Sequence, residues 1–464
     1  MLTNIITETI MNMQKRKRFL LKEEAEMKLN KLFVGVSALV LGATLLSGCG
    51  NSSKDDKSSS NGKTEITFWA APNPTQLKYW EGMAKEFEKT DKTITVKVSQ
   101  MKESPSSEAT IQSAIASKTA PTLSENINRS FAAQLATSKA IVPLQKQDSF
   151  DEIISARKMD KTIESWEFSD GNQYVLPVYS NPILFAWRLD TLKELGFNEV
   201  PKTYSEALAV ADKLKGTDKV LWAKKDIADP TAWMRWFDFF PLYDAASKGA
   251  NFVEGNKFVA DKDATVDVFD FMSTLSKDKV LRTTESTDPF ENGDSVMTDI
   301  GPWTFPNWAE KYPELKFGEN YTVTTPVVPD SMKDEKHVST YADAKGIVMY
   351  AQATKEQQKA AMKFLKFVYS NEKNDMKWLE TTSLIPARDD ATENAIFTEF
   401  FEKNPYLKVY AENVPYAIPA MDNEKYNDIQ QKFGEEAWVP VVRGEKTAND
   451  AYTDAKKAVE GVLQ

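Results

Sequence analysis

The sequence predicts an α/β fold with two lobes, each with a core of its own. From Thr64 onward, segments with strand-like alternation are followed by segments with helical spacing, an order typical of a largely parallel sheet covered by helices. The chain from Thr64 to Gln464 has about 400 residues, more than one hydrophobic core normally supports. Its aromatic residues, 11 Trp, 15 Tyr and 25 Phe, are numerous enough to line a ligand site as well as to fill two cores.

The first strand and helix are predicted by residue spacing. Thr64–Trp69 alternates and is rich in β formers, so we expect a strand. In Asn73-Pro74 the asparagine is typical of an N-cap and the proline of a first helical position, with Gln76 reaching back to the cap. The following helix is expected to bury one face, formed by Leu77, Trp80, Ala84 and Phe87.

The alternation continues along the next segments. Thr93–Val98 is a second predicted strand, and Ala109–Lys118 is a predicted helix. Ala120–Leu123 is expected to be a strand, Ser124–Asn128 a polar turn, and Phe131–Ser138 a helix.

Two later helices have recognisable starts. Thr203 and Glu206 have the spacing of a capping box. Thr354 and Gln357 have the same spacing before the predicted helix Lys355–Tyr369.

Met27–Gly50 has the order of an export signal. Lys28 and Lys31 form a short basic head, Leu32–Leu46 is mostly apolar and uncharged, and small residues follow. The apolar run is shorter than the roughly 20 residues that a membrane-spanning helix needs.

Cys49 is the only cysteine of the chain, so no disulfide can form within it. Its place after Leu-Ser-Gly resembles the lipobox of bacterial lipoproteins. The resemblance implies a signal peptide at 27–48, acylation of Cys49 as the first mature residue, and anchoring on the extracytoplasmic face of a Gram-positive cell membrane. Acyl chains hold a protein because each buried methylene contributes about 0.8 kcal/mol. The alternatives are a transmembrane anchor and an incidental cysteine.

The segments on either side of the signal have separate interpretations. Residues 1–26 are basic and then acidic, which fits poorly before a signal, so we hypothesise that translation starts at Met27. A long basic head is the alternative. Residues 49–63 contain no large apolar side chain, which predicts a flexible tether.

Composition excludes several function classes. The first 49 residues hold seven basic and four acidic side chains, so 51 basic and 64 acidic ones remain, which argues against binding nucleic acid or an anionic lipid surface. His337 is the only histidine, and no Gly-x-Ser-x-Gly or phosphate-binding loop motif occurs. We therefore expect no enzyme, no cofactor and no metal site. A glycosidase, which needs only two carboxylates, stays open on composition alone.

Motifs in collinear order resemble one family. They are the early strand, helix and Ala-Pro turn, Asp170–Pro177, Trp187–Asp190, Pro201–Glu206, Phe290–Gly293 with Gly301–Trp303, and Leu384–Arg388. Together they resemble the extracellular solute-binding lipoproteins of bacterial ABC importers, in particular carbohydrate-binding family 1, which is maltose-binding-protein-like.

The resemblance implies a class II periplasmic-binding-protein-like fold with a ligand cleft and a hinge between the lobes. The chain would cross between lobes near Ser180, Asp343 and Ile385. Lobe one would hold residues 64–180 and 342–384, and lobe two residues 181–341 and 385–464. The implied function is capture of an oligosaccharide and delivery to the transmembrane subunits of an ABC permease.

A sugar site needs flat aromatic side chains for C–H faces and planar amides or carboxylates for hydroxyls. Trp303 is the strongest candidate, because it follows Gly-Pro where the resembling family places a tryptophan against the sugar. One of Glu125, Asn126 and Asn128 is expected to touch ligand, although a helix cap also explains them. The other candidates follow strands or flank the expected crossings: Trp69, Asn73, Tyr179, Trp233, Tyr341, Asp343, Trp378 and Arg388.

Alternatives to an oligosaccharide stay open at this point. A polyol, a peptide or a glycerol phosphodiester is a possible cargo, and a basic cleft would favour the phosphodiester. A surface glycosidase and an adhesin are the alternatives outside binding proteins.

Overall fold

The computed structural model describes residues 62–232 and 235–464, which pack as one compact unit. The expected upstream segment, signal peptide, Cys49 and all but the end of the tether lie outside the described residues, as does Trp233. No helix in the described residues has both the length and the apolar content to cross a membrane.

The first sheet has six strands. Its order is β13 (Ala417–Ile418), β12 (Thr340–Met349), β3 (Leu123–Ile127), β1 (Thr64–Ala70) and β2 (Ile94–Gln100), and β4 (Leu176–Pro182) also pairs with β12. Strand β1 is parallel to β2 and β3, whereas β12 is antiparallel to β3 and β4. In β1 the alternate residues Ile66, Phe68 and Ala70 are buried, as the period of a strand requires.

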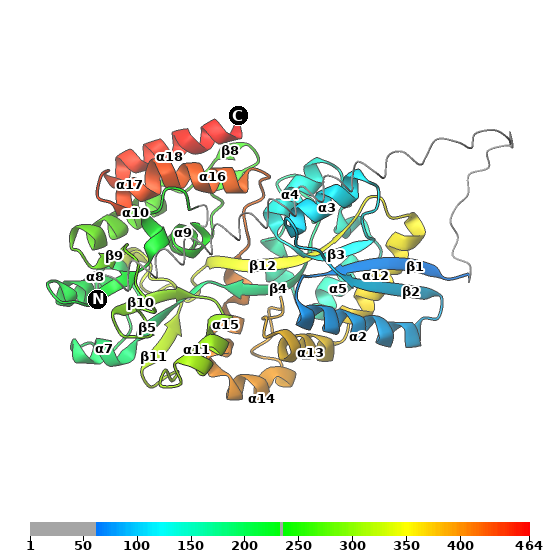
Figure 1. The fold of residues 1–464 in the computed structure, drawn as a ribbon, viewed down its shortest axis with the longest axis horizontal. Coiled ribbons are helices and arrows are strands. Elements are labelled where there is room, and N and C mark those ends of the chain that lie inside the picture. Colours follow the sequence, from blue (N-terminus) through cyan, green and yellow to red (C-terminus); the bar gives the residue numbers. More distant parts are fainter. Residues whose placement is uncertain (1–61, 233–234) are drawn as a thin grey trace, which may run out of the picture. The chain divides into compact units, whose positions relative to one another are not determined.

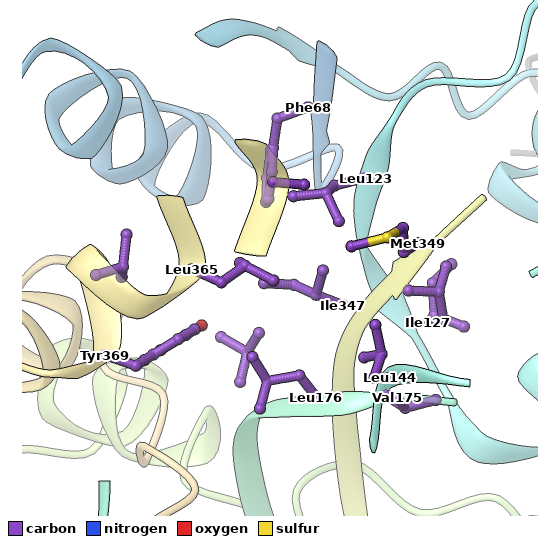
Figure 2. Packing of buried hydrophobic residues seen from close by; sticks show 14 of the residues in the cluster. Phe68, Leu123, Ile127, Leu144, Val175, Leu176, Ile347, Met349, Leu365 and Tyr369 are labelled. Atoms are coloured by element: carbon purple, nitrogen blue, oxygen red, sulfur yellow. The ribbon is translucent and has the colours of Figure 1, made fainter. Parts of the chain in front are cut away.

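Helices pack against this sheet and share a hydrophobic core with it (Figure 2). Phe68, Leu123 and Ile347 from three strands meet Leu365 and Tyr369 from a helix there. The helices are α2 (Pro74–Thr90), α3 (Ser107–Ala116), α4 (Arg129–Thr137), α5 (Phe150–Arg157), α6 (Asp160–Glu164), α12 (Lys355–Tyr369) and α13 (Glu372–Thr382).

The second sheet has five strands. Its order is β11 (Tyr321–Thr324), β5 (Leu184–Arg188), β10 (Ser295–Ile300), β6 (Val220–Ala223) and β9 (Leu281–Arg282). A hydrophobic core lies on each face of this sheet. In β5 the side chains of Phe185 and Trp187 pack into one core, and those of Leu184 and Ala186 pack into the other. This sheet is therefore buried on both faces.

Two groups of helices form the cores on either side of the second sheet. The larger core contains residues of α7 (Leu189–Glu194), α8 (Tyr204–Leu214), α9 (Phe239–Ala246), α10 (Lys262–Lys277), α16 (Tyr426–Phe433), α17 (Val439–Val442) and α18 (Ala448–Leu463). The smaller contains residues of α11 (Thr304–Lys311), α14 (Ala395–Lys403) and α15 (Pro405–Asn413). A short hairpin joins β7 (Val253–Glu254) to β8 (Lys257–Phe258).

Three chain segments lie side by side where the first sheet gives way to the second (Figure 1). Strand β4 continues through Ile183 into β5, and the Ile183 amide donates to the Tyr341 carbonyl of β12 at 2.8 Å. The third segment passes Ile385, whose carbonyl accepts from the Ser180 amide at 3.0 Å. These backbone bonds hold the three segments against one another.

Several predicted elements are confirmed. Strand β1 begins at Thr64, and Asn73 caps α2 by accepting from the Thr75 amide at 2.9 Å. Thr354 and Gln357 form the predicted capping box at the start of α12.

Two local predictions are wrong, and a third is confirmed in part. Leu123–Ile127 is a strand rather than the end of one followed by a turn, because its polar side chains are satisfied inside the fold. The Gln76 amide does not reach back to its cap but donates to Glu125 at 3.4 Å. The capping box predicted at Thr203 and Glu206 is confirmed in one half, since the Thr203 hydroxyl accepts from the Glu206 amide at 3.4 Å, while the Glu206 carboxylate accepts from the Lys202 amide at 2.8 Å.

Candidate functional site

A cavity of about 720 Å³ lies between segments of the two sheets. The end of β3 and the starts of α3 and α4 form one side, β12 contributes Lys345, and residues before α9 and around the start of α16 form the other side. Its lining is mostly polar: Glu103, Pro105, Ser106, Ser107, Glu108, Asn126, Asn128, Ser130, Phe131, Gln134, Trp236, Lys345, Glu424, Tyr426 and Asn427.

The two asparagines at the end of β3 both line this cavity, but only one has a free side chain. The Asn128 side-chain oxygen accepts from the Phe131 amide at 2.8 Å and from the Ser130 hydroxyl at 2.9 Å, which caps α4. The Asn126 side chain makes no hydrogen bond with a described residue, and its backbone has a φ of 68°. Asparagine tolerates this left-handed conformation better than most residues. Asn126 is thus the amide of this loop that is open to a ligand.

Glu125 lies behind the cavity wall, where it is only 1% exposed. Its carboxylate accepts from the Ala71 amide at 2.7 Å and from Gln76, so it fixes the loop between β1 and α2. Burial raises the pKa of Glu125 to about 7, although these hydrogen bonds and the charge of Lys345 oppose the shift. The structure therefore gives Glu125 a positioning role.

The raised pKa of Glu125 predicts a pH-dependent stability that Glu125→Gln removes. Between the ordinary pKa of 4.5 and about 7, the folded chain holds a proton that the unfolded chain has lost, so the free energy of unfolding falls as pH rises through this window. Above pH 7 the loss is complete. Urea unfolding of both proteins across pH 4 to 8 checks this, and parallel curves would contradict it.

Strand β12 forms the floor of the site. Asp343 and Lys345 are two residues apart, so their side chains share a face, and they pair with Asn181 and Tyr179 of β4. Burial raises the pKa of Asp343, and the Lys345 charge partly offsets this. The buried Tyr179 ring stacks on Trp378 at 6.3 Å between centroids. Of these residues only Lys345 lines the cavity, and Asp343 lies beside it on the same face of β12.

Aromatic side chains form the wall on the second-sheet side. Trp236 lines the cavity and contacts the Tyr341 ring at 6.1 Å, and the Tyr341 hydroxyl lies 2.9 Å from that of Tyr426, another lining residue. The next residue, Phe237, meets Trp303 edge-on at 6.1 Å. Tyr341 itself is buried behind this wall.

Trp303 is exposed although it is a large apolar side chain. It is 44% exposed, whereas most large hydrophobic residues of the described chain are buried. Its ring lies directly over Gly301, where any side chain would collide with it. The glycine beneath and Phe237 beside it hold the indole in place with much of its surface facing solvent.

The structure places most predicted site residues outside the cavity lining, among them Trp303, Tyr179 and Asp343. Trp69 is half-buried against the first core, and Asn73 is an exposed cap. Trp378 and Arg388 are each 1% exposed, and Arg388 pairs with Asp375 at 2.9 Å and Asp390 at 2.8 Å. Each of these last four site residues has a structural role that accounts for it.

Sequence reasoning missed much of the lining. Glu103, Gln134, Lys345, Glu424 and Asn427 come from segments separated by up to 324 residues, and no motif links them. The register of β12 against β4 is what brings Lys345 to the site, and this register has no signature in the sequence. Within residues 62–232 and 235–464, no cluster of three or more His, Cys, Asp and Glu side chains could hold a metal ion.

Two sheets joined by three neighbouring segments, with a polar and aromatic cavity between them, define the class of two-lobed binding proteins. Residues 82–409 match the family model described as bacterial extracellular solute-binding protein, so the chain belongs to that family. It is thus a bacterial extracellular solute-binding protein.

Solved structures support this fold. An uncharacterized protein of Listeria monocytogenes EGD-e is 69% identical, with 87% of this chain and 100% of that one covered and a TM-score of 0.86. The cyclic alpha-maltosyl-1,6-maltose binding protein of Arthrobacter globiformis is 18% identical over 87% and 99% of the two chains, with a TM-score of 0.72. UgpB of Mycobacterium tuberculosis, in complex with glycerophosphocholine, is 16% identical over 87% and 99%, with a TM-score of 0.64. The chain therefore has the two-lobed, maltose-binding-protein-like α/β fold.

Proposed function

We propose that this protein captures an oligosaccharide in the 720 Å³ cavity and delivers it to an ABC permease, without catalysing a reaction. The observation that carries the proposal is the exposed indole of Trp303, which lies outside the cavity lining but is joined to the lining residue Trp236 through the ring of Phe237. Sugars combine apolar C–H faces with a rim of hydroxyls, so a site for them pairs flat aromatic surfaces with amides and carboxylates. The volume is within the range of about 300–1,000 Å³ that small-molecule sites occupy.

The charges of the lining argue against the phosphodiester alternative. Lys345 is the one cationic residue among those lining the cavity, against the carboxylates of Glu103, Glu108 and Glu424. A site for an anionic phosphodiester would need more cationic hydrogen-bond donors, such as Arg or Lys, than carboxylates. A neutral polyol or a short peptide stays as the second candidate cargo.

The lobe boundaries and the hinge are part of the same proposal. Lobe one holds residues 64–180 and 342–384, lobe two holds residues 181–341 and 385–464, and the ligand favours the closed arrangement because it contacts both sides. Small-angle scattering with and without ligand tests this, because closure lowers the radius of gyration. An unchanged radius under saturating ligand would contradict it.

The lipid anchor at Cys49 is also proposed, on the sequence alone. Growth with a labelled palmitate analogue should label the full chain and leave a Cys49→Ala variant unlabelled and released from the membrane. Equal release of both proteins would overturn the proposal.

A panel titration tests the cargo. Intrinsic tryptophan fluorescence and calorimetry would be followed with maltotriose, cellotriose, a polyol and a tripeptide, together with an assay for released sugar. Saturable binding of a trisaccharide without cleavage is the expected result. A response to the polyol or peptide alone would replace the saccharide, and product release would indicate a glycosidase.

Asn126→Gly is expected to weaken saccharide binding without harming the fold. Glycine accepts a φ of 68° freely, so stability should be unchanged or slightly higher, while the lost amide removes hydrogen bonds worth about 1–2 kcal/mol, or roughly tenfold in affinity. Lys139→Gly, at a residue with a φ of 56° away from the cavity lining, is the matched control. Equal affinities of the two variants would show that Asn126 serves only the turn.

A further inference from the structure

Three cavities run along one seam between the two sides of the fold. The 720 Å³ cavity shares Glu424 with a second of about 310 Å³, which in turn shares Ser169 and Asp422 with a third of about 530 Å³. Residues of α4 line all three: Phe131 the first, Ala133 the second and Arg129 the third. The cavities are therefore parts of one continuous seam.

The lining of this seam is strongly acidic. Eight carboxylates line it against two cationic side chains, although the whole chain has 68 acidic and 58 basic residues. None of the eight forms an ion pair with a described residue, although Asp170 accepts hydrogen bonds from Asn172 and Tyr174, and Asp422 from Ser169. They are Glu103, Glu108, Glu164, Glu167, Asp170, Glu254, Asp422 and Glu424.

The two cations of the seam differ in their surroundings. The charge of Lys345 lowers the pKa of the Glu125 and Asp343 carboxyl groups, which burial raises. Arg129 is 8% exposed, donates to the Glu167 carbonyl and lies over the Phe168 ring at 5.4 Å. Lys345 forms no ion pair with a described residue, so the lining sets eight carboxylates against one available cation.

The seam also retains a polar group that is suited to a saccharide. The Nε of Arg129 is buried and has no hydrogen-bond partner, although the side chain lines the third cavity. A hydroxyl or ring oxygen would satisfy this donor without bringing negative charge among the carboxylates. The same lining would repel a carboxylate, sulfate or phosphate group.

We propose that this acidic seam makes the site selective for charge, so that among saccharides of one skeleton it prefers those with ammonium groups, accepts neutral ones and rejects anionic ones. Clefts lined by one sign of charge focus the field and raise the local concentration of the opposite charge. Because these carboxylates are open to solvent, each is expected to change the affinity for a charged ligand by only a few-fold. This inference rests on the proposed saccharide function.

The test compares three ligands that differ only in charge. The better binder of maltotriose and cellotriose is compared with its 6-amino-6-deoxy derivative and its 6-carboxyl derivative, by calorimetry at low and at high ionic strength. The expected order of affinity is amino, neutral, carboxyl, with steps of about threefold to tenfold at low salt that shrink at high salt, because salt screens exposed charges.

A variant separates charge from shape at the modified position. The triple variant Glu103→Gln, Glu108→Gln, Glu424→Gln should bring the affinities of the three ligands closer together. The ratios of affinity are compared within the variant, because these side chains also line the cavity and the variant's affinity for the neutral trisaccharide is expected to fall as well. Its control carries Glu81→Gln, Glu380→Gln and Glu402→Gln, three exposed acids away from the seam, and should keep the order.

The two proposals fail in different ways. A carboxyl derivative that binds as tightly as the amino derivative, or an order that the triple variant leaves unchanged, overturns the charge selectivity while the neutral trisaccharide still binds. Absence of binding by every saccharide overturns the proposed function, and the charge selectivity with it.

Discussion

Replacing Asp375 with asparagine is expected to lower the free energy of unfolding by about 3–5 kcal/mol, because it leaves buried positive charge without its partner. The carboxylate is 2% exposed and lies between two buried arginines, with Arg157 at 2.8 Å and Arg388 at 2.9 Å. Arg388 keeps a second partner in Asp390, whereas Arg157 has no other carboxylate among the described ion pairs. Arg157 therefore bears most of the loss.

The place of this triad makes its loss costly for the site as well. Arg157 donates to the carbonyls of Pro177 and Val178, where β4 runs toward the second sheet, with the Val178 bond at 2.7 Å. Arg388 directly follows the Ile385–Ala387 segment, which is hydrogen-bonded to β4. One carboxylate thus fixes two of the three segments that join the sheets.

Chemical denaturation measures this effect. Most domains are stable by only about 5–15 kcal/mol, so a loss of the expected size shifts the transition strongly. Asp212→Asn is the control, because its side chain is 68% exposed and its pairing with Lys215 should contribute less than about 1 kcal/mol. If the two variants unfold at the same denaturant concentration, the buried triad does not stabilise the fold as argued.

The fold was predictable where a local sequence pattern alone determines a helix or a strand. The alternation of β1 and the capping residues before α2 and α12 determine those elements without help from the rest of the chain. Strand β3 was not predictable as far as Ile127, because Ser124 and Glu125 are polar and only the Tyr350 hydroxyl, the Ala71 amide and Gln76 make their burial possible. Tertiary partners override composition there.

The site was predictable only in part for a related reason. Trp303 has a local signal, since Gly301 leaves room for a ring and the following helix begins at Thr304. Proximity to an expected crossing, by contrast, does not say which way a side chain faces. Trp378 and Arg388 flank the third crossing in sequence, yet they are among the most deeply buried side chains of the described chain.

Replacing Trp303 with alanine is expected to weaken saccharide binding at least about 30-fold, the largest effect of any single change at the site. Aromatic anchors of this kind commonly cost 2 kcal/mol or more when truncated, and each 1.4 kcal/mol is tenfold in affinity. Gly301 and Phe237 hold the indole in place before the ligand binds. The Trp303 side chain therefore loses little conformational entropy on binding. Stability should change by less than about 1 kcal/mol, because the side chain is 44% exposed.

Two further variants distinguish a stacking surface from mere bulk. Trp303→Phe keeps a flat ring and should recover part of the affinity, whereas Trp303→Leu keeps apolar volume without a flat face and should not. Val259→Ala, at the other exposed large apolar residue of the described chain, should bind as the parent does. Calorimetry with the trisaccharide that binds best compares them. If the saccharide affinity of Trp303→Ala is within a few-fold of that of Val259→Ala, the exposed indole does not bind the sugar. The aromatic side chains of Trp236 and Tyr426, which line the cavity, would then be the next candidates.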